Sequence, residues 1–354
     1  MTQTAVRTEP ARPATRPAPA GVARGRRTRL VGLLVSIALL VVAVTLSIAV
    51  GSRSIPVGTV WDLLWNEDGS PESVIVHDLR IPRTLLGLLV GVALGLSGTL
   101  MQALTRNPLA EPGLLGVNLG AATGVVVAIA FFGITSLTGY VWFALVGAAL
   151  TSVAVFALGS VGRAPTPDRQ VLAGVAITAV LGAFVVAVLV TDRDAFDRFR
   201  FWDVGSLAER DAPTVARVAP FVLAGAVLAL AIGRPLNALA LGEEAGRALG
   251  VRVRRTQAVG MLAVTLLCGA ATAAVGPIWF VGLAVPHAAR LVTGPDTRWV
   301  LAYSLLLAPV LLLGADVLGR VVVAPSELSV GVVTAFLGAP VFLALARRRR
   351  IASL

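Results

Sequence analysis

The chain has 354 residues, of which 56% are hydrophobic and 14% charged, and its mean hydropathy is +0.86. This composition excludes the water-soluble classes and indicates a polytopic membrane protein. All 30 basic residues are arginine, so the chain lacks the lysine of a phosphate-binding loop, and we expect no ATPase site and no enzymatic activity of its own. One cysteine and two histidines exclude a disulfide framework or a metal cage of these residues, so we expect no metal site and no cofactor.

Ten stretches are apolar enough to be transmembrane helices, because a bilayer core requires about 20 apolar residues per helix. They run over residues 30–50, 81–104, 113–133, 140–161, 169–191, 214–233, 256–275, 278–292, 299–319 and 329–346. The predicted fold is therefore all-α, with a ten-helix membrane domain over residues 30–346. The eighth stretch is the shortest, and it follows a break at Gly276 and Pro277.

The positions of the arginines predict the orientation, since loops rich in basic residues remain in the cytoplasm. With the N-terminus inside, the inner segments hold 21 of the 30 arginines and six of the 19 acidic residues, a net charge of +15, and the outer segments carry −4. An even number of spans then places both termini in the cytoplasm. The total charge of +11 thus reflects topology and predicts no nucleic-acid partner.

Two terminal segments lie outside the predicted membrane domain. Residues 1–29 are rich in Ala, Pro, Arg and Thr, which is typical of a disordered tail, here cytoplasmic. The alternative is a secretory signal, but the tail is longer than a typical basic n-region and the apolar stretch after it is longer than a typical h-region. Residues 347–354 are predicted to be a basic cytoplasmic C-terminus.

Glycines recur every four residues in the second and third spans, and such stripes allow helix backbones to approach closely in lipid. They are Gly87, Gly91 and Gly95, and then Gly116, Gly120 and Gly124. Packing is a better interpretation of these stripes than a ligand site. They predict a compact bundle.

Ionisable residues are almost absent from the ten spans, and Asp316 is the main exception. A carrier driven by protons or sodium usually requires a buried carboxylate or histidine in mid-membrane. Asp316 lies one helical turn before Arg320, which favours an ion pair near the membrane surface over a proton relay. The source of energy is therefore expected to lie outside this chain.

Seven segments closely resemble the FecCD family, the permease subunits of ABC importers for ferric siderophores, haem and cobalamin. They are residues 79–85, 95–98, 102–112 with 115–117, 202–207, 239–251, 276–290 and 331–342. The resemblance implies ten helices with both termini cytoplasmic, in agreement with the span count and the charge distribution. It also implies a multi-pass protein of the cell membrane that works as a dimer around a central pathway.

The same resemblance implies two cytoplasmic ATPase subunits and an extracytoplasmic substrate-binding protein as partners. A ferric siderophore is the commonest cargo of the family, with haem and cobalamin as alternatives. The dimer partner is either a second copy of this chain or a related permease. The rival functions are a secondary transporter driven by an ion gradient and, more distantly, a membrane assembly subunit that does not transport.

The predicted cytoplasmic loop 234–255 alternates apolar and charged residues, which suits one or two short amphipathic helices. By resemblance it is the coupling segment that contacts the ATPase. The candidate contact residues are Leu239, Leu241, Gly242, Glu243, Glu244, Arg247, Leu249 and Gly250. The alternative is a helix that lies on the lipid headgroups.

Three arginines on the predicted outer side oppose the positive-inside bias and so require another explanation. They are Arg80, Arg83 and Arg320. Similar arginines in the family receive acidic side chains of the binding protein, and charge-assisted contacts of this kind give orientation and fast association. The alternative is that they are topological anchors.

A pathway for a bulky chelate is expected to have small, weakly polar side chains along it, and Gln102 and Thr178 are the candidates. The chain departs from the family pattern at two positions. Ser329 stands where the family commonly has proline, and Thr297 stands where it commonly has histidine. Serine lacks the fixed φ of proline, so the turn into the last span is expected to be looser.

Overall fold

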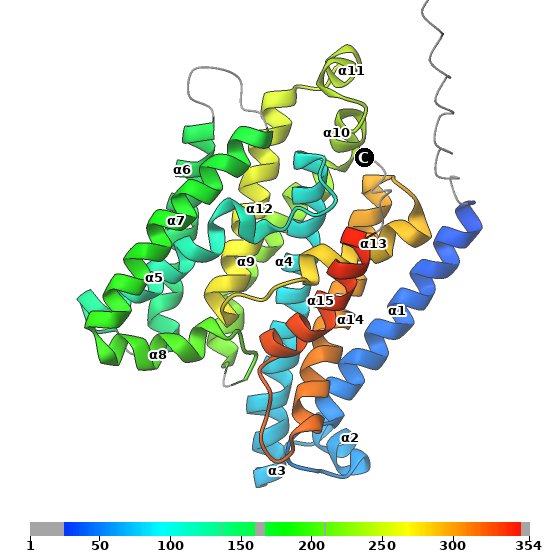
Figure 1. The fold of residues 1–354 in the computed structure, drawn as a ribbon. Helices are drawn as coiled ribbons and strands as arrows, with labels where there is room; N and C mark the ends of the chain where they lie inside the picture. Colours follow the sequence, from blue (N-terminus) through cyan, green and yellow to red (C-terminus); the bar gives the residue numbers. More distant parts are fainter. Residues whose placement is uncertain (1–24, 135, 160–166, 209, 348–354) are drawn as a thin grey trace, which may run out of the picture.

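In the computed structural model of the chain, residues 25–134, 136–159, 167–208 and 210–347 are described, and no strand occurs among them. Each of the ten predicted spans coincides with one helix (Figure 1). The helices are α1 (Arg26–Ala49), α4 (Ile81–Thr105), α5 (Val117–Phe132), α6 (Leu137–Gly159), α7 (Pro167–Thr191), α9 (Ala212–Ala231), α12 (Val253–Val275), α13 (Val281–Thr293), α14 (Thr297–Val322) and α15 (Val330–Arg347). The predicted tail lies outside these residues up to position 24, and the predicted basic C-terminus does so from position 348.

Seven of these helices are long and apolar enough to cross a membrane, and α5 and α15 are shorter apolar helices. α13 has 13 residues and is therefore only about 20 Å long, which is less than the hydrocarbon core of about 30 Å. It begins three residues later than predicted because Gly276–Phe280 is not helical. The all-helical membrane fold is confirmed, whereas ten crossings and the sides of the termini stay predictions.

The structure adds short helices that the apolar pattern does not predict. α2 (Val57–Trp65), α3 (Pro71–Val74) and η1 (Ile75–Arg80) gather at one end of the bundle, and α10 (Gly233–Leu239) and α11 (Glu243–Ala248) lie at the opposite end. α8 (Arg193–Asp203) packs across α5 and α7, and η2 (Pro112–Leu115) precedes α5. We call the two ends the α2/α3 end and the α10/α11 end. The start of α1 and the end of α15 both lie toward the α10/α11 end.

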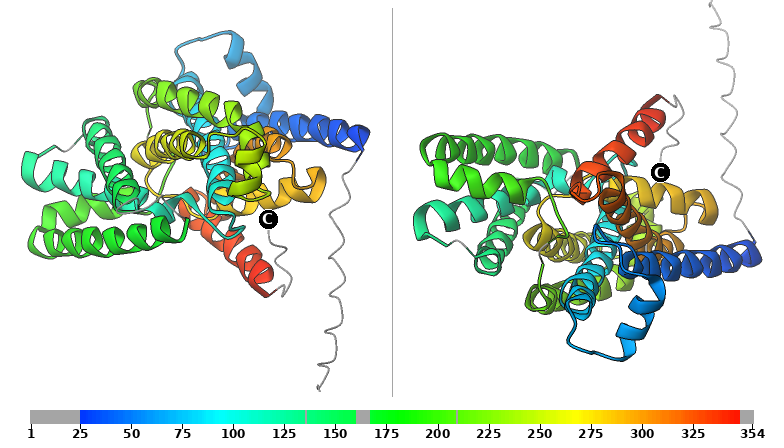
Figure 2. Two further views of the ribbon diagram at one scale, coloured as in Figure 1. Left: turned by 90° about the horizontal axis from the view of Figure 1, so that it is seen from above. Right: turned by 90° about the horizontal axis from the view of Figure 1, so that it is seen from below.

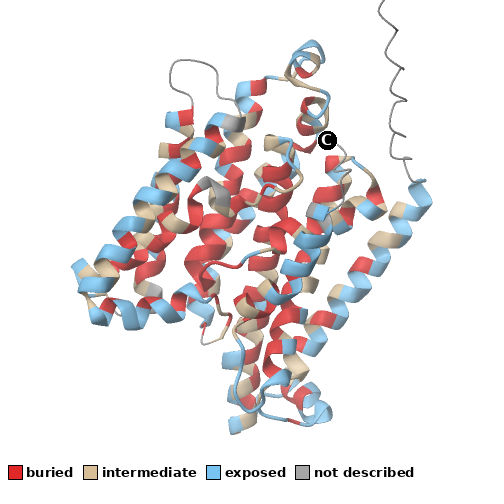
Figure 3. Ribbon diagram, viewed as in Figure 1, coloured by how far each residue is buried: buried red, intermediate tan, exposed pale blue. Residues whose placement is uncertain are grey.

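The core is centred on α4 and α12, whose surfaces are mostly buried, whereas α1 and α7 expose most of theirs (Figure 3). Glycines allow the close packing. Gly91 lies against Pro309 of α14, and Gly98 lies against the backbone of Gly282 at the start of α13. Gly120 and Gly124 pack in the same way on α6. The packing interpretation of the glycine stripes is therefore confirmed.

We expect Gly98→Ala to destabilise the protein by about 1–3 kcal/mol, the usual cost of overpacking. The added methyl group would meet the backbone of Gly282, so α4 and α13 would have to separate. Thermal unfolding of the purified protein in detergent measures the effect. Gly314→Ala is the matched control, since a methyl group there meets no atom within 4 Å. An equal loss of stability in both variants would contradict the packing argument.

Candidate docking and coupling sites

Two arginines cap the end of α1 at the α2/α3 end. Arg80 donates from Nη1 to the carbonyl oxygens of Ile48 and Ala49, at 2.9 and 2.8 Å, and from Nη2 to that of Arg53 at 2.7 Å. Arg320 donates from Nη1 to the carbonyl oxygens of Ser47 and Val50, at 2.8 and 3.0 Å. The last carbonyls of a helix lack partners within it, and basic side chains can satisfy them. Both arginines therefore hold α1 against α4 and α14.

Asp316 joins the two neighbouring guanidinium groups of Arg83 and Arg320. Arg83 contacts both carboxylate oxygens, with Nη2 2.8 Å from Oδ1 and Nε 3.0 Å from Oδ2. Arg320 donates Nε to Oδ2 at 3.0 Å and also bonds that oxygen through Nη2. The predicted contact between Asp316 and Arg320 is confirmed, and Arg83 is an additional partner.

Arg83 has a second carboxylate partner in Glu327, whose Oε2 accepts from Nη1 at 2.7 Å. Glu327 lies in the segment between α14 and α15, at the α2/α3 end. Burial alone would raise the pKa of Glu327, but the hydrogen bond and charge of Arg83 lower it below its ordinary value. The hydrogen bond with Ser52 and the charge of Arg320 add to this effect, so Glu327 is a carboxylate held in its ionised form chiefly by Arg83.

The three predicted docking arginines lie in one cluster but differ in exposure. Arg80 and Arg320 are 4% and 1% exposed, and their donors already have acceptors within the chain. The side chain of Arg83 is 12% exposed and that of its partner Glu327 is 28% exposed. A docking role stays a prediction for all three, and Arg83 is the one whose partner is open to solvent.

The predicted coupling segment forms two short helices, α10 and α11, as its amphipathic pattern indicates. Gly242 precedes α11 with φ of 107° and Gly250 follows it with φ of 82°, values that favour glycine. Leu239 packs inward near Gly246, whereas Leu241 and Leu249 are 70% and 63% exposed. These two leucines are apolar side chains without cover at the tip of the α10/α11 end.

The two glutamates of α11, Glu243 and Glu244, differ in their contacts. Glu243 accepts from Arg247 Nη2 at 3.1 Å and from Gln257 Nε2 at 3.3 Å, so it fixes α11 on α12. Glu244, in contrast, is exposed to solvent.

 Glu244 is thus the acidic side chain of α11 that a partner protein can reach.

The coupling segment is tied to the turn between α13 and α14. Asn237 of α10 donates Nδ2 to Asp296 Oδ1 at 2.6 Å and accepts from the backbone N–H of Thr297 at 2.7 Å. Burial raises the pKa of Asp296, but hydrogen bonds from Arg298 and Asn237 outweigh it, so the pKa lies below its ordinary value. Because the bond to Thr297 uses its backbone, the departure from the family pattern at this position leaves the tie intact.

The two pathway candidates have different surroundings. Gln102 is fully buried between α4 and α13, where its Oε1 accepts from Arg290 Nη1 at 2.6 Å. Its Nε2 donates to the carbonyl oxygens of Gly282 and Leu283, each at 3.4 Å. Thr178 of α7 is partly exposed and lies beside Gly116. Both pathway roles stay predictions, and the contacts of Gln102 explain how α13 is held.

Glu111 lies within the 102–112 segment that resembles the family, and the structure gives it a specific contact. Its Oε1 accepts from the backbone N–H of Phe280 at 2.7 Å, at the start of α13. Phe280 has φ of 70°, which is unusual for a residue with a Cβ atom. Irregular backbone is tolerated within a membrane protein where its polar groups find partners, and a carboxylate suits the positive end of a helix. The only signal in the sequence was the break at Gly276 and Pro277.

Helices of this length and apolarity, packed through glycines and joined by polar clusters, define a multi-pass membrane protein. The chain belongs to the FecCD transport family, whose sequence model matches residues 39–348. Members of this family are the membrane permease subunits of ABC importers, which work with a separate ATPase and a substrate-binding protein. The chain is accordingly an ABC permease of the inner membrane.

Individual relatives agree with this assignment over nearly the whole chain. The ferric enterobactin transport system permease protein FepD of Escherichia coli is 48% identical over 330 residues, which are 93% of this chain and 97% of that protein. The hemin transport system permease protein HmuU of Yersinia pestis is 38% identical, over 88% and 94% of the two chains. A solved structure of a metal-chelate type ABC transporter in an inward-facing conformation has a TM-score of 0.79 and 26% identity, and it covers 90% of this chain and 99% of that one.

We expect Asp316→Asn to destabilise the protein by about 3–5 kcal/mol, because it leaves the buried charges of Arg83 and Arg320 without their shared counter-charge. Thermal or denaturant unfolding in detergent measures the change. Asp197→Asn is the control, since it breaks the exposed pair with Arg200 and should cost at most about 1 kcal/mol. Similar values for the two variants would show that the cluster does not stabilise the fold.

Proposed function

We propose that this chain is the permease subunit of an ATP-driven importer whose cargo is a ferric siderophore. The observation that carries the proposal is the 48% identity to the ferric enterobactin permease across almost the full length of both chains. The hemin permease is less similar, at 38% identity. Haem and cobalamin therefore remain the alternative cargoes of the same importer.

The polar clusters support an external source of energy. Asp316 is paired with two arginines near the α2/α3 end, so it does not resemble the mid-membrane carboxylate of a proton- or sodium-coupled carrier. The exposed Leu241 and Leu249 offer an apolar contact for a groove on an ATPase subunit. In this proposal α10 and α11 face the cytoplasm, and the tie from Asn237 to Asp296 passes their movement to α13 and α14.

The opposite end is proposed to receive the substrate-binding protein through Arg80, Arg83 and Arg320. Their cluster carries an excess of positive charge, since only Asp316 and Glu327 oppose three arginines within it. A positive surface suits acidic side chains on the two lobes of a binding protein. Arg80 and Arg320 contribute charge from buried positions, and Arg83 is the arginine that a carboxylate can reach directly.

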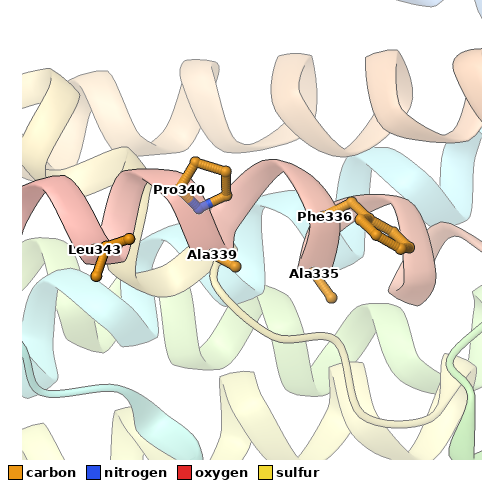
Figure 4. Close-up of a pocket in the computed structure, with 5 residues that line it drawn as sticks. All are labelled: Ala335, Phe336, Ala339, Pro340 and Leu343. Carbon is orange, nitrogen blue, oxygen red and sulfur yellow. The ribbon is translucent and has the colours of Figure 1, made fainter.

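The permease is proposed to work as a dimer, with a second copy or a related permease, through the face that carries α7 and α15. In both end-on views these two helices flank the same side of the bundle (Figure 2). On α15 a groove of about 520 Å³ is lined by Ala335, Phe336, Ala339, Pro340 and Leu343 (Figure 4). Small residues on a membrane helix allow a partner helix to approach closely. A pathway at this interface would be apolar and weakly binding, as passage of a preformed chelate requires.

The function is tested by uptake of a radioactive ferric siderophore into proteoliposomes that contain the permease, its ATPase and a substrate-binding protein. We expect uptake to require ATP inside and to be insensitive to uncouplers. Uptake that is abolished by uncouplers and indifferent to ATP would instead support a secondary transporter. Parallel assays with haem and cobalamin identify the cargo.

The same assay tests the coupling segment when Glu243 and Glu244 are both changed to arginine. Uptake should fall while membrane insertion stays normal. Because Glu243 also holds Arg247 and Gln257, the single change Glu244→Arg separates contact with the ATPase from loss of internal bonds. Normal uptake in both variants would count against the assigned role.

The dimer face is tested by cysteine cross-linking of Ala339→Cys in membranes. Cys268 is buried, so it should not interfere. We expect a cross-linked dimer on oxidation. Leu150→Cys on the exposed surface of α6 is the control and should remain monomeric. Cross-linking at position 150 and none at 339 would place the interface elsewhere.

A further inference from the structure

Arg83 is bound by two carboxylates of different accessibility. Asp316 is 1% exposed and is shared with Arg320, so it cannot leave without stranding buried charge. Glu327 is 28% exposed, contacts Arg83 through a single oxygen at 2.7 Å, and belongs to a connecting segment. Glu327 also has a side-chain hydrogen bond with Ser52, which is only partly buried, so water can replace that bond. Glu327 can therefore turn into water, and its departure opens Nη1 of Arg83.

The other arginines of the cluster offer no comparable opening. Arg80 uses both of its terminal nitrogens on the carbonyl oxygens of Ile48, Ala49 and Arg53. Arg320 donates from Nη1 to two carbonyl oxygens at the end of α1, and from Nε to Asp316. Displacing either set would leave backbone carbonyls at the end of α1 without donors, which is costly when they are buried. The replaceable contact of the cluster is the one between Arg83 and Glu327.

We propose that Glu327 occupies the place on Arg83 that a carboxylate of the substrate-binding protein takes on docking, so that docking exchanges one carboxylate for the other. This inference rests on the proposed function, in which Arg83 faces the binding protein. The exchange preserves the charge around Arg83 and needs no proton transfer. In the undocked permease Glu327 keeps the guanidinium group satisfied.

The exchange also changes the segment that carries Glu327. Residues 323–329 join α14 to α15, and the contact with Arg83 ties this segment to α4. Once Glu327 leaves, the segment keeps the bond from Leu328 N to Gly319 O at 3.0 Å. Docking at the cluster thus loosens the connection into α15, the helix that carries the proposed dimer face.

The test measures docking of the substrate-binding protein that supports uptake in the reconstitution described above. The permease complex in nanodiscs is compared with its Glu327→Gln variant at low ionic strength. We expect the dissociation constant to fall about fivefold, the scale on which a partly exposed ion pair contributes. Glu72→Gln is the matched control, because it removes the same charge at the same end from the Arg53 pair, and it should change docking less than twofold.

Arg83→Gln should weaken docking at least tenfold, and its docking should be indifferent to a further change of Glu327. Unchanged or weaker docking in Glu327→Gln would overturn the exchange, whereas failure of every binding protein to support uptake would overturn the proposed function itself. Hydrogen exchange in the wild-type complex is an independent measurement that requires no folded variant. Backbone amides of residues 323–329 should exchange faster on docking, and slower exchange would also overturn the proposal.

Discussion

The structure depends on the lack of water in the bilayer, which obliges each polar group to find its partner within the protein. The end of α1 illustrates the constraint, because its last carbonyls receive donors from Arg80 and Arg320. These bonds connect three helices that are far apart in the sequence. The charge that the two arginines bring is then balanced in part by Asp316, which connects Arg83 to the same cluster.

The same constraint explains the short helix α13. The amide of Phe280 at its start lacks a helical partner, and the carbonyl of Gly282 lacks its usual donor because Pro286 has no N–H. Glu111 accepts from the amide of Phe280, and Gln102 donates to the carbonyls of Gly282 and Leu283. Close passage of Gly98 against Gly282 brings these groups within reach. A helix that is too short to cross the membrane is thereby held firmly, with its far end next to the coupling segment.

Much of the fold could be predicted from the sequence, because long apolar runs and glycine stripes are local patterns. All ten predicted spans coincide with helices for this reason. The partners of Arg80 and Arg320 could not be predicted, since they are backbone carbonyls of a helix more than 25 residues away in one case and more than 250 in the other. The contact of Glu111 with Phe280 likewise spans 169 residues and depends on how α4, α12 and α13 pack. Amphipathic α8 was missed because its alternating charges resemble an ordinary loop.

The capping of α1 gives a structural reason for arginine in place of lysine at this cluster. A guanidinium group is a flat fork of several N–H donors, whereas an ammonium group concentrates its donors on one nitrogen. Arg80 uses the fork to reach three carbonyl oxygens at once, and Arg320 reaches two carbonyls and a carboxylate. A lysine could not bridge these separated acceptors from one position. At this cluster the choice of arginine over lysine is therefore a matter of shape, and it makes the junction of three helices depend on side chains that no other cation could replace.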